Sequence, residues 1–115
     1  MVVSARAADT FDRVFAALAD PTRRDIVQTV LQHEHSVSAL ADRYPMSFAA
    51  VQKHVAILER ADLVAKRRDG REQRVRGNIE TLRRAQGLFD QLESAWRSRI
   101  ERMTSILDNE PGDSR

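Results

Sequence analysis

Residues 47–76 read SFAAVQKHVAILERADLVAKRRDGREQRVR, and this stretch decides the fold. In its first half, apolar residues recur at i, i+4 and i+7 (Val51, Val55 and Leu58), which gives a helix over about residues 47–60 one apolar face. Ser47 is a suitable N-cap, because its hydroxyl can accept a hydrogen bond from a first-turn backbone N–H. We therefore predict a helix with one packed face and one free face.

The second half of the stretch has the pattern of a β-hairpin over about residues 64–76. Asp69-Gly70 tolerates the positive φ angles of a two-residue type I′ turn, so we place the loop there. In that register Val64 faces Val75, and Arg68 faces Arg71. Two arginines directly opposite each other repel, and a bound anion would relieve the repulsion.

Positive charge is concentrated in this hairpin. Residues 64–76 hold six basic and two acidic residues, a local net charge of +4, whereas the whole chain has 19 basic and 17 acidic residues and a net charge of +2. A charged hairpin is often only a solvated surface. Here it follows a capped helix with a free face, and this combination favours binding to nucleic acid.

The composition excludes several classes of protein. The chain has no cysteine, so disulfides, thiolate metal sites and cysteine nucleophiles are excluded. No apolar run approaches the ~20 residues that cross a bilayer, and residues 1–20 lack the apolar core of a signal peptide. We therefore expect a cytoplasmic protein without membrane contact.

Two helices are predicted near the start of the chain. Phe11, Val14, Phe15 and Leu18 follow a helical period and predict a helix over about residues 8–19. Asp20 can cap the next helix, and Pro21, with its fixed φ and missing N–H, fits the first helical position. The second helix should therefore run from Pro21 to about Gln32.

A short third helix is expected between Ser38 and Tyr44, with Pro45 ending it. Only Pro45 and Met46 would then separate it from the helix at Ser47. This spacing predicts a tight helix-turn-helix pair.

The last predicted element is a helix over about residues 78–107, with Asn78 as N-cap and Glu80 in its first turn. A helix of about 30 residues is ~45 Å long, which exceeds the width of a small domain. We expect part of its apolar stripe to contact a second copy of the chain, rather than to fold wholly onto its own domain. The predicted dimer interface consists of Phe11, Phe15, Leu82, Phe89, Leu92, Trp96 and Met103.

The length of 115 residues suits one domain, which we place at residues 1–107. Residues 108–115 are polar and contain Pro and Gly. They are predicted to form a disordered tail.

Four segments carry a family resemblance: ALADPTRRDIV (17–27), HSVSALAD (35–42), MSFAAVQKHVAILERADLV (46–64) and RRDGREQRVR (67–76). In this order they resemble the ArsR/SmtB family of winged helix-turn-helix transcriptional regulators, over roughly residues 10–107. The resemblance implies a mainly α fold with a small β-hairpin and a long C-terminal dimerisation helix. It also implies a homodimer joined through its first and last helices, which represses promoters and releases DNA when an effector binds.

The sequence departs from the family pattern in ways that bear on the effector. Metal-sensing members have Cys-Val-Cys where this chain has Ser36-Val37-Ser38, and a serine hydroxyl is no thiolate ligand. The final helix holds no histidine for the family's other metal site. We expect no metal and no cofactor, which leaves a small organic ligand or no ligand. Asp62 stands where the family commonly has Gly, and Asp tolerates the left-handed conformation better than most residues.

The resemblance places the helix from Ser47 to Arg60 in the major groove of double-stranded DNA and makes the hairpin the wing. Gln52 and Lys53 are the candidate base readers, because glutamine can bond an adenine edge and lysine a guanine edge. Phe48 and Ala49 offer apolar contact, and Ser47 lies at a helix start that can hold a phosphate. The wing candidates for backbone contact are Lys66, Arg67, Arg68, Arg71 and Arg74. His54 is also a candidate, although a packed, hydrogen-bonded structural histidine is the alternative.

These features predict a sequence-specific transcriptional repressor, not an enzyme, that binds an inverted repeat as a homodimer. The alternative is a module that binds DNA without sequence preference or binds another protein. An enzyme is disfavoured, because the sequence has no Gly-rich phosphate loop and no histidine spaced with carboxylates for catalysis.

Overall fold

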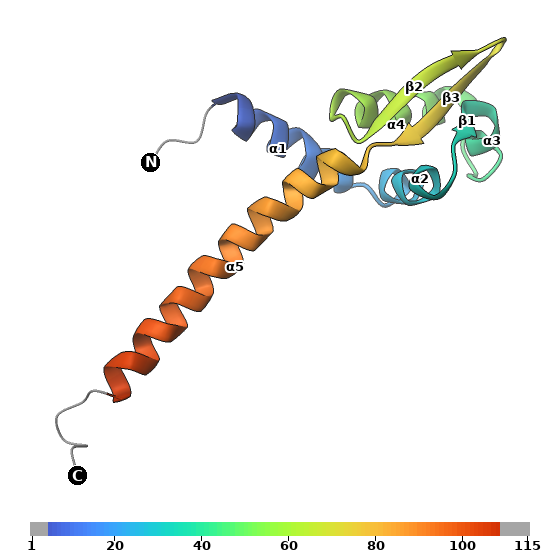
Figure 1. The fold of residues 1–115 in the computed structure, drawn as a ribbon. Helices are drawn as coiled ribbons and strands as arrows, with labels where there is room; N and C mark the ends of the chain where they lie inside the picture. The colour runs from blue at the N-terminus through green and yellow to red at the C-terminus, as the bar shows by residue number, and fades with distance from the viewer. Residues whose placement is uncertain (1–4, 109–115) are drawn as a thin grey trace. The chain divides into compact units, whose positions relative to one another are not determined.

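The computed structural model describes the backbone of residues 5–108 and the side chains of residues 9–108. Over this range the elements are α1 (Ala5–Leu18), α2 (Pro21–Gln32), β1 (His35–Ser36), α3 (Val37–Ala41), α4 (Phe48–Arg60), β2 (Val64–Asp69), β3 (Glu72–Gly77) and α5 (Ile79–Asp108), as Figure 1 shows. The protein is mainly α-helical with a small antiparallel sheet, as predicted. It forms two compact units, residues 1–83 and 84–115, which divide within α5. One domain over residues 1–107 therefore stays a prediction.

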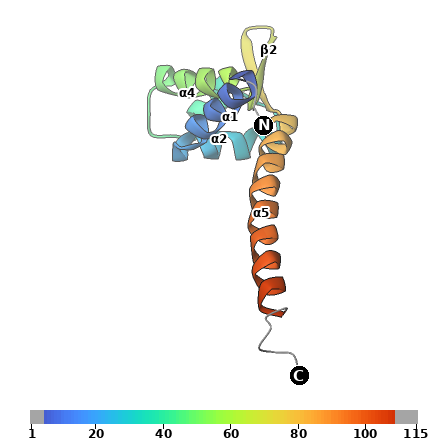
Figure 2. The ribbon, with the colours of Figure 1, turned by 90° about the vertical axis from the view of Figure 1, so that its left-hand side faces the viewer.

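The core of the first unit forms where α2, α3 and α4 meet one another and the sheet. Its largest fully buried apolar side chains are Val14, Ile26, Leu40, Val51, Val55, Leu58, Leu63 and Val75. The predicted packed face of α4 is confirmed, because its three apolar residues are at most 1% exposed. α4 also packs against β2, while the tip of the β2–β3 hairpin projects beyond the neighbouring helices of this unit (Figures 1 and 2).

Side-chain caps fix the starts of the helices, as expected. The Arg23 backbone N–H donates to Asp20 Oδ2 at 2.9 Å, directly before Pro21. The Ala50 N–H donates to Ser47 Oγ at 3.1 Å, and the Glu80 N–H donates to Asn78 Oδ1 at 3.2 Å. Each cap satisfies an N–H that has no partner inside its own helix. α1 begins earlier than predicted, at Ala5.

The third helix differs from its prediction. α3 runs from Val37 to Ala41, because Ser36 caps it: the Ala39 N–H donates to Ser36 Oγ at 3.0 Å. Tyr44 lies outside the helix, where its hydroxyl donates to Asp25 Oδ2 at 2.6 Å, and burial raises the pKa of this phenol. Residues 42–47, rather than two residues, therefore connect α3 to α4.

The sheet contains a third strand that the sequence analysis did not anticipate. β1 pairs with β3, which gives the antiparallel order β1-β3-β2. His35 of β1 pairs with Val75 of β3. A strand of two residues is too short to show an alternating pattern of apolar side chains.

The predicted register of the hairpin is wrong. The two-residue loop is Gly70-Arg71, so Asp69 pairs with Glu72 and Val64 with Gly77. Gly70 has φ +63°, whereas Arg71 is not among the described residues with positive φ. A positive φ at only the first loop position is the pattern of a type II′ turn, which places Gly there. The like-charge pair across the strands is therefore Arg67 and Arg74, not Arg68 and Arg71.

Asp62 has φ +60°, so it adopts the left-handed conformation predicted for the end of α4. The Thr81 hydroxyl donates to the Asp62 carbonyl oxygen at 2.6 Å. The Asn78 N–H donates to the Leu63 carbonyl oxygen at 3.0 Å. These bonds tie the first turn of α5 to the turn that follows α4.

α5 ends one residue later than predicted. Asp108 is the last residue of α5 rather than part of a tail, and the rest of the predicted tail, residues 109–115, lies outside the described residues. No helix among residues 5–108 combines the length and apolar character that crossing a membrane requires.

Gly77 ends β3 at a position where α2 leaves no room for a side chain. A Cβ there would lie 2.5 Å from Leu31 Cδ2 and 3.0 Å from Leu31 Cα. The end of the leucine side chain can rotate away, but its Cα belongs to the helix backbone. We therefore expect Gly77→Ala to lower the free energy of unfolding by ~1–3 kcal/mol, because it overpacks this contact.

Urea unfolding at a fixed protein concentration measures the effect. Gly87→Ala is the matched control, since a Cβ at Gly87 meets nothing within 4 Å. Removing a glycine from a helix interior should raise stability by ~0.5–1 kcal/mol. A Gly77→Ala variant that is as stable as the wild type, or more stable, would contradict the close contact between Gly77 and α2.

Candidate nucleic-acid interface

α4 carries two sets of side chains on opposite faces. Ser47, Phe48, Ala49, Gln52 and Lys53 are all exposed, while Val51, Val55 and Leu58 are buried. The Phe48 side chain is 47% exposed even though it is a large apolar group. The helix therefore presents an aromatic ring, an amide and an ammonium group on the face that the core does not use.

His54 lies at the edge of this face and is only partly exposed. Its Nδ1 lies 3.3 Å from Arg23 Nη1 and 3.9 Å from Asp20 Oδ2. A guanidinium has only donors, so Nδ1 accepts in this pair. The geometry supports the structural alternative for His54, in which it joins α4 to the start of α2.

Arg23 and Arg24, which the sequence analysis did not select, hold the end of α1. Arg23 Nε donates to the Ala17 carbonyl oxygen at 2.8 Å, and Arg24 Nη1 donates to the Leu18 carbonyl oxygen at 2.7 Å. These carbonyls lack partners within the helix, and cations at a helix C-terminus are favourable. The hydrogen bond from the Arg23 N–H lowers the pKa of the Asp20 carboxyl at the same junction.

The β2–β3 hairpin, Val64–Gly77, is called the wing below, and its side chains alternate between two faces. Val64, Lys66 and Arg68 share the face of buried Val75, which lies toward α4. Lys66 Nζ lies 3.3 Å from Glu59 Oε1 of α4. Arg67 and Arg74 lie on the other face.

Glu34, at the junction of α2 and β1, pairs with both arginines of that second face. Its Oε1 accepts from Arg67 Nη2 at 2.6 Å and from Arg74 Nε at 2.8 Å. The hydrogen bonds from Arg74 and Arg67 lower the pKa of the Glu34 carboxyl. The anion that relieves the like-charge pair of the hairpin is therefore a residue of the chain itself.

The other wing arginines are available. Among the residues that the structure describes, the side chains of Arg68, Arg71 and Arg76 make no hydrogen bond or ion pair. Arg68 and Arg71 were predicted candidates, whereas Arg76 was counted in the charge of the hairpin but not selected. The wing thus presents arginines whose side chains are unpaired, and two others, Arg67 and Arg74, that carboxylates of the chain already neutralise.

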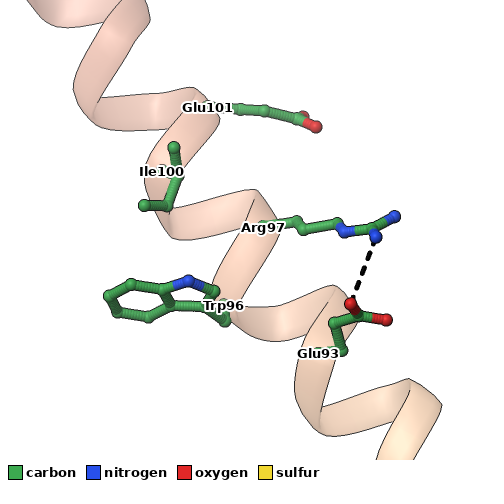
Figure 3. A pocket seen from close by; sticks show the side chains of 5 residues that line it. All are labelled: Glu93, Trp96, Arg97, Ile100 and Glu101. Atoms are coloured by element: carbon green, nitrogen blue, oxygen red, sulfur yellow. Dashed lines mark hydrogen bonds and ion pairs between the residues drawn. The ribbon is translucent and has the colours of Figure 1, made fainter.

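Four of the predicted interface residues of α5 form an exposed apolar stripe. Phe89, Leu92, Trp96 and Met103 are 53–59% exposed, and Ile100, Ile106 and Leu107 extend the stripe. Figure 3 shows Trp96 and Ile100 on one side of the helix, and Arg97 and Glu101 on the other. The five residues lining the depression in that figure all belong to α5, so it is an open helix surface rather than an enclosed cavity.

The remaining predicted interface residues lie in the first unit. Phe15 is 37% exposed, while Phe11 and Leu82 are partly buried. The Phe11 and Phe15 rings stack with their centroids 6.5 Å apart.

No metal site is apparent in the described part of the chain. Within it, no three His, Asp or Glu side chains are grouped so that they could hold an ion. The Ser36 hydroxyl, at the position of the family's first thiolate, caps α3.

Comparison with known proteins gives a match to one domain model and to related transcriptional regulators. A helix-turn-helix domain model matches residues 18–67, from the end of α1 into the wing. The chain is similar to an HTH-type transcriptional regulator of Mycobacterium tuberculosis, with 31% identity over 103 residues that cover 90% of this chain and 94% of the relative.

Solved structures agree with this match. An ArsR-like transcriptional regulator from Rhodococcus sp. RHA1 has a TM-score of 0.78 and 31% identity, covering 87% of this chain and 94% of that one. A homodimeric winged helix-turn-helix DNA-binding domain from Mycobacterium bovis has a TM-score of 0.62 and 28% identity, covering 84% and 90%.

Proposed function

This chain belongs to the ArsR family of winged helix-turn-helix transcriptional regulators, and we propose that it binds an inverted-repeat operator as a homodimer and represses transcription there. The observation that carries the proposal is the exposed face of α4, with Gln52 and Lys53, beside a wing with unpaired Arg68 and Arg71. A helix whose opposite face is packed in the core is held rigidly and is suited to enter a major groove.

In this proposal the exposed face of α4 reads the bases. The Gln52 amide can bond adenine N6 and N7, and the Lys53 ammonium can bond guanine O6 and N7. Phe48 and Ala49 provide apolar contact for thymine methyl groups. Ser47 and the positive end of the helix dipole hold a backbone phosphate, which fixes the depth of the helix in the groove. His54 has the least support as a DNA contact, because Arg23 engages its Nδ1.

The wing supplies backbone contacts that carry little sequence information. Of the five predicted wing residues, Arg68 and Arg71 are unpaired and are the first candidates for phosphate contact. Lys66, Arg67 and Arg74 are paired with carboxylates of the chain.

We place the dimer interface on the apolar residues of α1 and α5. The exposed stripe of α5 supports this, since an exposed row of large apolar side chains is unusual for a surface that stays in water. The homodimeric state named for the M. bovis domain is also in line with it. A dimer would present two α4 helices to two half-sites whose centres lie about one helical turn, ~34 Å, apart.

Lys53→Ala tests base reading by α4. We expect this variant to lose ~1–3 kcal/mol of affinity for the operator while its affinity for random duplex changes little, because a base contact contributes only on the correct sequence. Titrations of both duplexes at one fixed salt concentration measure the two affinities.

Arg68→Ala is the comparison variant. A lost phosphate contact should weaken binding to every sequence and reduce the slope of log K against log salt by about 0.9 for each bound protomer. If Lys53→Ala lowers affinity for operator and random duplex equally, Lys53 is a backbone contact and the proposed base reading is wrong.

A further inference from the structure

Glu34 joins the body of the protein to both strands of the wing. It lies between the end of α2 and β1, and a single carboxylate oxygen accepts hydrogen bonds from Arg67 of β2 and Arg74 of β3. The two arginines are direct partners across the strands. Without an anion between them, their charges would repel.

The contacts of Glu34 are those that a DNA phosphate oxygen would make. Guanidinium groups bind carboxylates and phosphates through the same short, charge-assisted hydrogen bonds. The side chain of Glu34 is 27% exposed, and those of Arg67 and Arg74 are 55% and 28% exposed. The ion pairs therefore lie at a surface where a DNA strand could replace the carboxylate.

The arginines of the wing differ in whether a carboxylate of the chain engages them. The side chains of Arg68 and Arg71 have no hydrogen-bond or ion-pair partner among the described residues, although they belong to the same hairpin as Arg67 and Arg74. Glu72 is also near Arg74, but its Oε2 is 3.4 Å from Arg74 Nη1 and makes no bond to Arg67. Glu34 is the described carboxylate that engages both arginines at once.

We propose that Glu34 acts as a built-in substitute for a DNA phosphate, which withholds Arg67 and Arg74 from the DNA backbone and so limits binding that is independent of sequence. This inference rests on the proposed function, because it assumes that the wing lies along DNA. Backbone contacts strengthen binding to all sequences, so withholding two cations per protomer lowers the affinity for every duplex, including the large excess of sites that lack the operator sequence.

Glu34→Gln tests this role in the full-length protein. The glutamine keeps the shape of the side chain but removes the charge that holds the two guanidinium groups. We expect binding to random duplex to become tighter, and the slope of log K against log salt to steepen by about 0.9 for each arginine that gains a phosphate. For two arginines, affinity should fall roughly tenfold more per protomer between 50 and 200 mM salt than it does in the wild type.

Glu72→Gln is the matched control, because it removes the same charge from the same hairpin. It should change the slope much less, since Glu72 engages one arginine at a longer distance. A second control repeats Glu34→Gln in an Arg67→Ala/Arg74→Ala background, where it should have no more effect than Glu72→Gln. Comparing the two backgrounds shows whether Glu34→Gln acts through the two arginines or through a general loss of negative charge.

The outcomes distinguish the two proposals. If Arg68→Ala weakens binding but Glu34→Gln matches Glu72→Gln, weakens binding, or keeps its effect without the two arginines, the role of Glu34 is overturned. If Arg68→Ala leaves affinity for both operator and random duplex unchanged, the wing does not contact DNA, and that part of the proposed function fails instead.

Discussion

Leu92→Glu is expected to make the protein a monomer and to weaken binding to a two-half-site operator by at least ~100-fold, given the advantage that linked sites provide. Leu92 is 59% exposed and belongs to the apolar stripe of α5. In a dimer it would be buried against a second copy, where an unpaired carboxylate is costly. A monomer can engage only one half-site, so it loses the advantage of the second recognition helix.

Sedimentation velocity and operator titration measure this effect together. Ser94→Glu is the matched control, because it introduces the same side chain on the same exposed part of α5, about 200° around the helix from Leu92. The control should stay dimeric and bind the operator. If Leu92→Glu sediments as a dimer, the stripe of α5 is not the interface.

Leu58→Ala is expected to lower the free energy of unfolding by ~2–5 kcal/mol, through lost burial and the cavity left behind. Leu58 is fully buried on the packed face of α4. A loss of this size is a large part of the ~5–15 kcal/mol that stabilises a typical domain. Urea unfolding gives the change, and the protein concentration is held constant because the proposed dimerisation would contribute to stability.

Phe48→Ala is the control on the opposite face of the same helix. Since Phe48 is 47% exposed, its truncation should change stability by only ~0.5 kcal/mol. Its effect should appear instead as weaker operator binding, about threefold or more for a lost contact of ~0.7 kcal/mol. Equal destabilisation by both variants would contradict the division of α4 into a packed face and a reading face.

The features that sequence reasoning predicted correctly are local ones. The start of α2 at Pro21, the caps Asp20, Ser47 and Asn78, and the packed face of α4 each depend on residues within a few positions of one another. Such features follow from hydrogen bonds and periodicity that a short stretch of chain determines by itself.

The register of the wing shows why local patterns can fail. Moving the loop from Asp69-Gly70 to Gly70-Arg71 shifts each pairing by two residues. Side chains in a strand alternate with a period of two, so this shift leaves every residue on the same face, and the apolar pattern fits both registers. Pairing with β1 and the tight approach of Gly77 to α2 are tertiary contacts, and local patterns do not contain them.

Glu34 could not be selected from the sequence for a related reason. It is separated from Arg67 by 33 positions and from Arg74 by 40. It is one of many acidic residues in the chain, and only the fold brings it to the wing. The candidate reading residues Gln52 and Lys53 could be selected, because the packed face of a single helix determines which side chains are left free.

The most direct test of sequence-specific reading by a symmetric dimer is selection of bound sequences from a random duplex pool with the full-length protein. The account predicts enrichment of an inverted repeat whose half-sites are centred about one helical turn, ~34 Å, or a multiple of it apart. A pool that stays random after repeated selection, although the protein retains bound duplex, would contradict it.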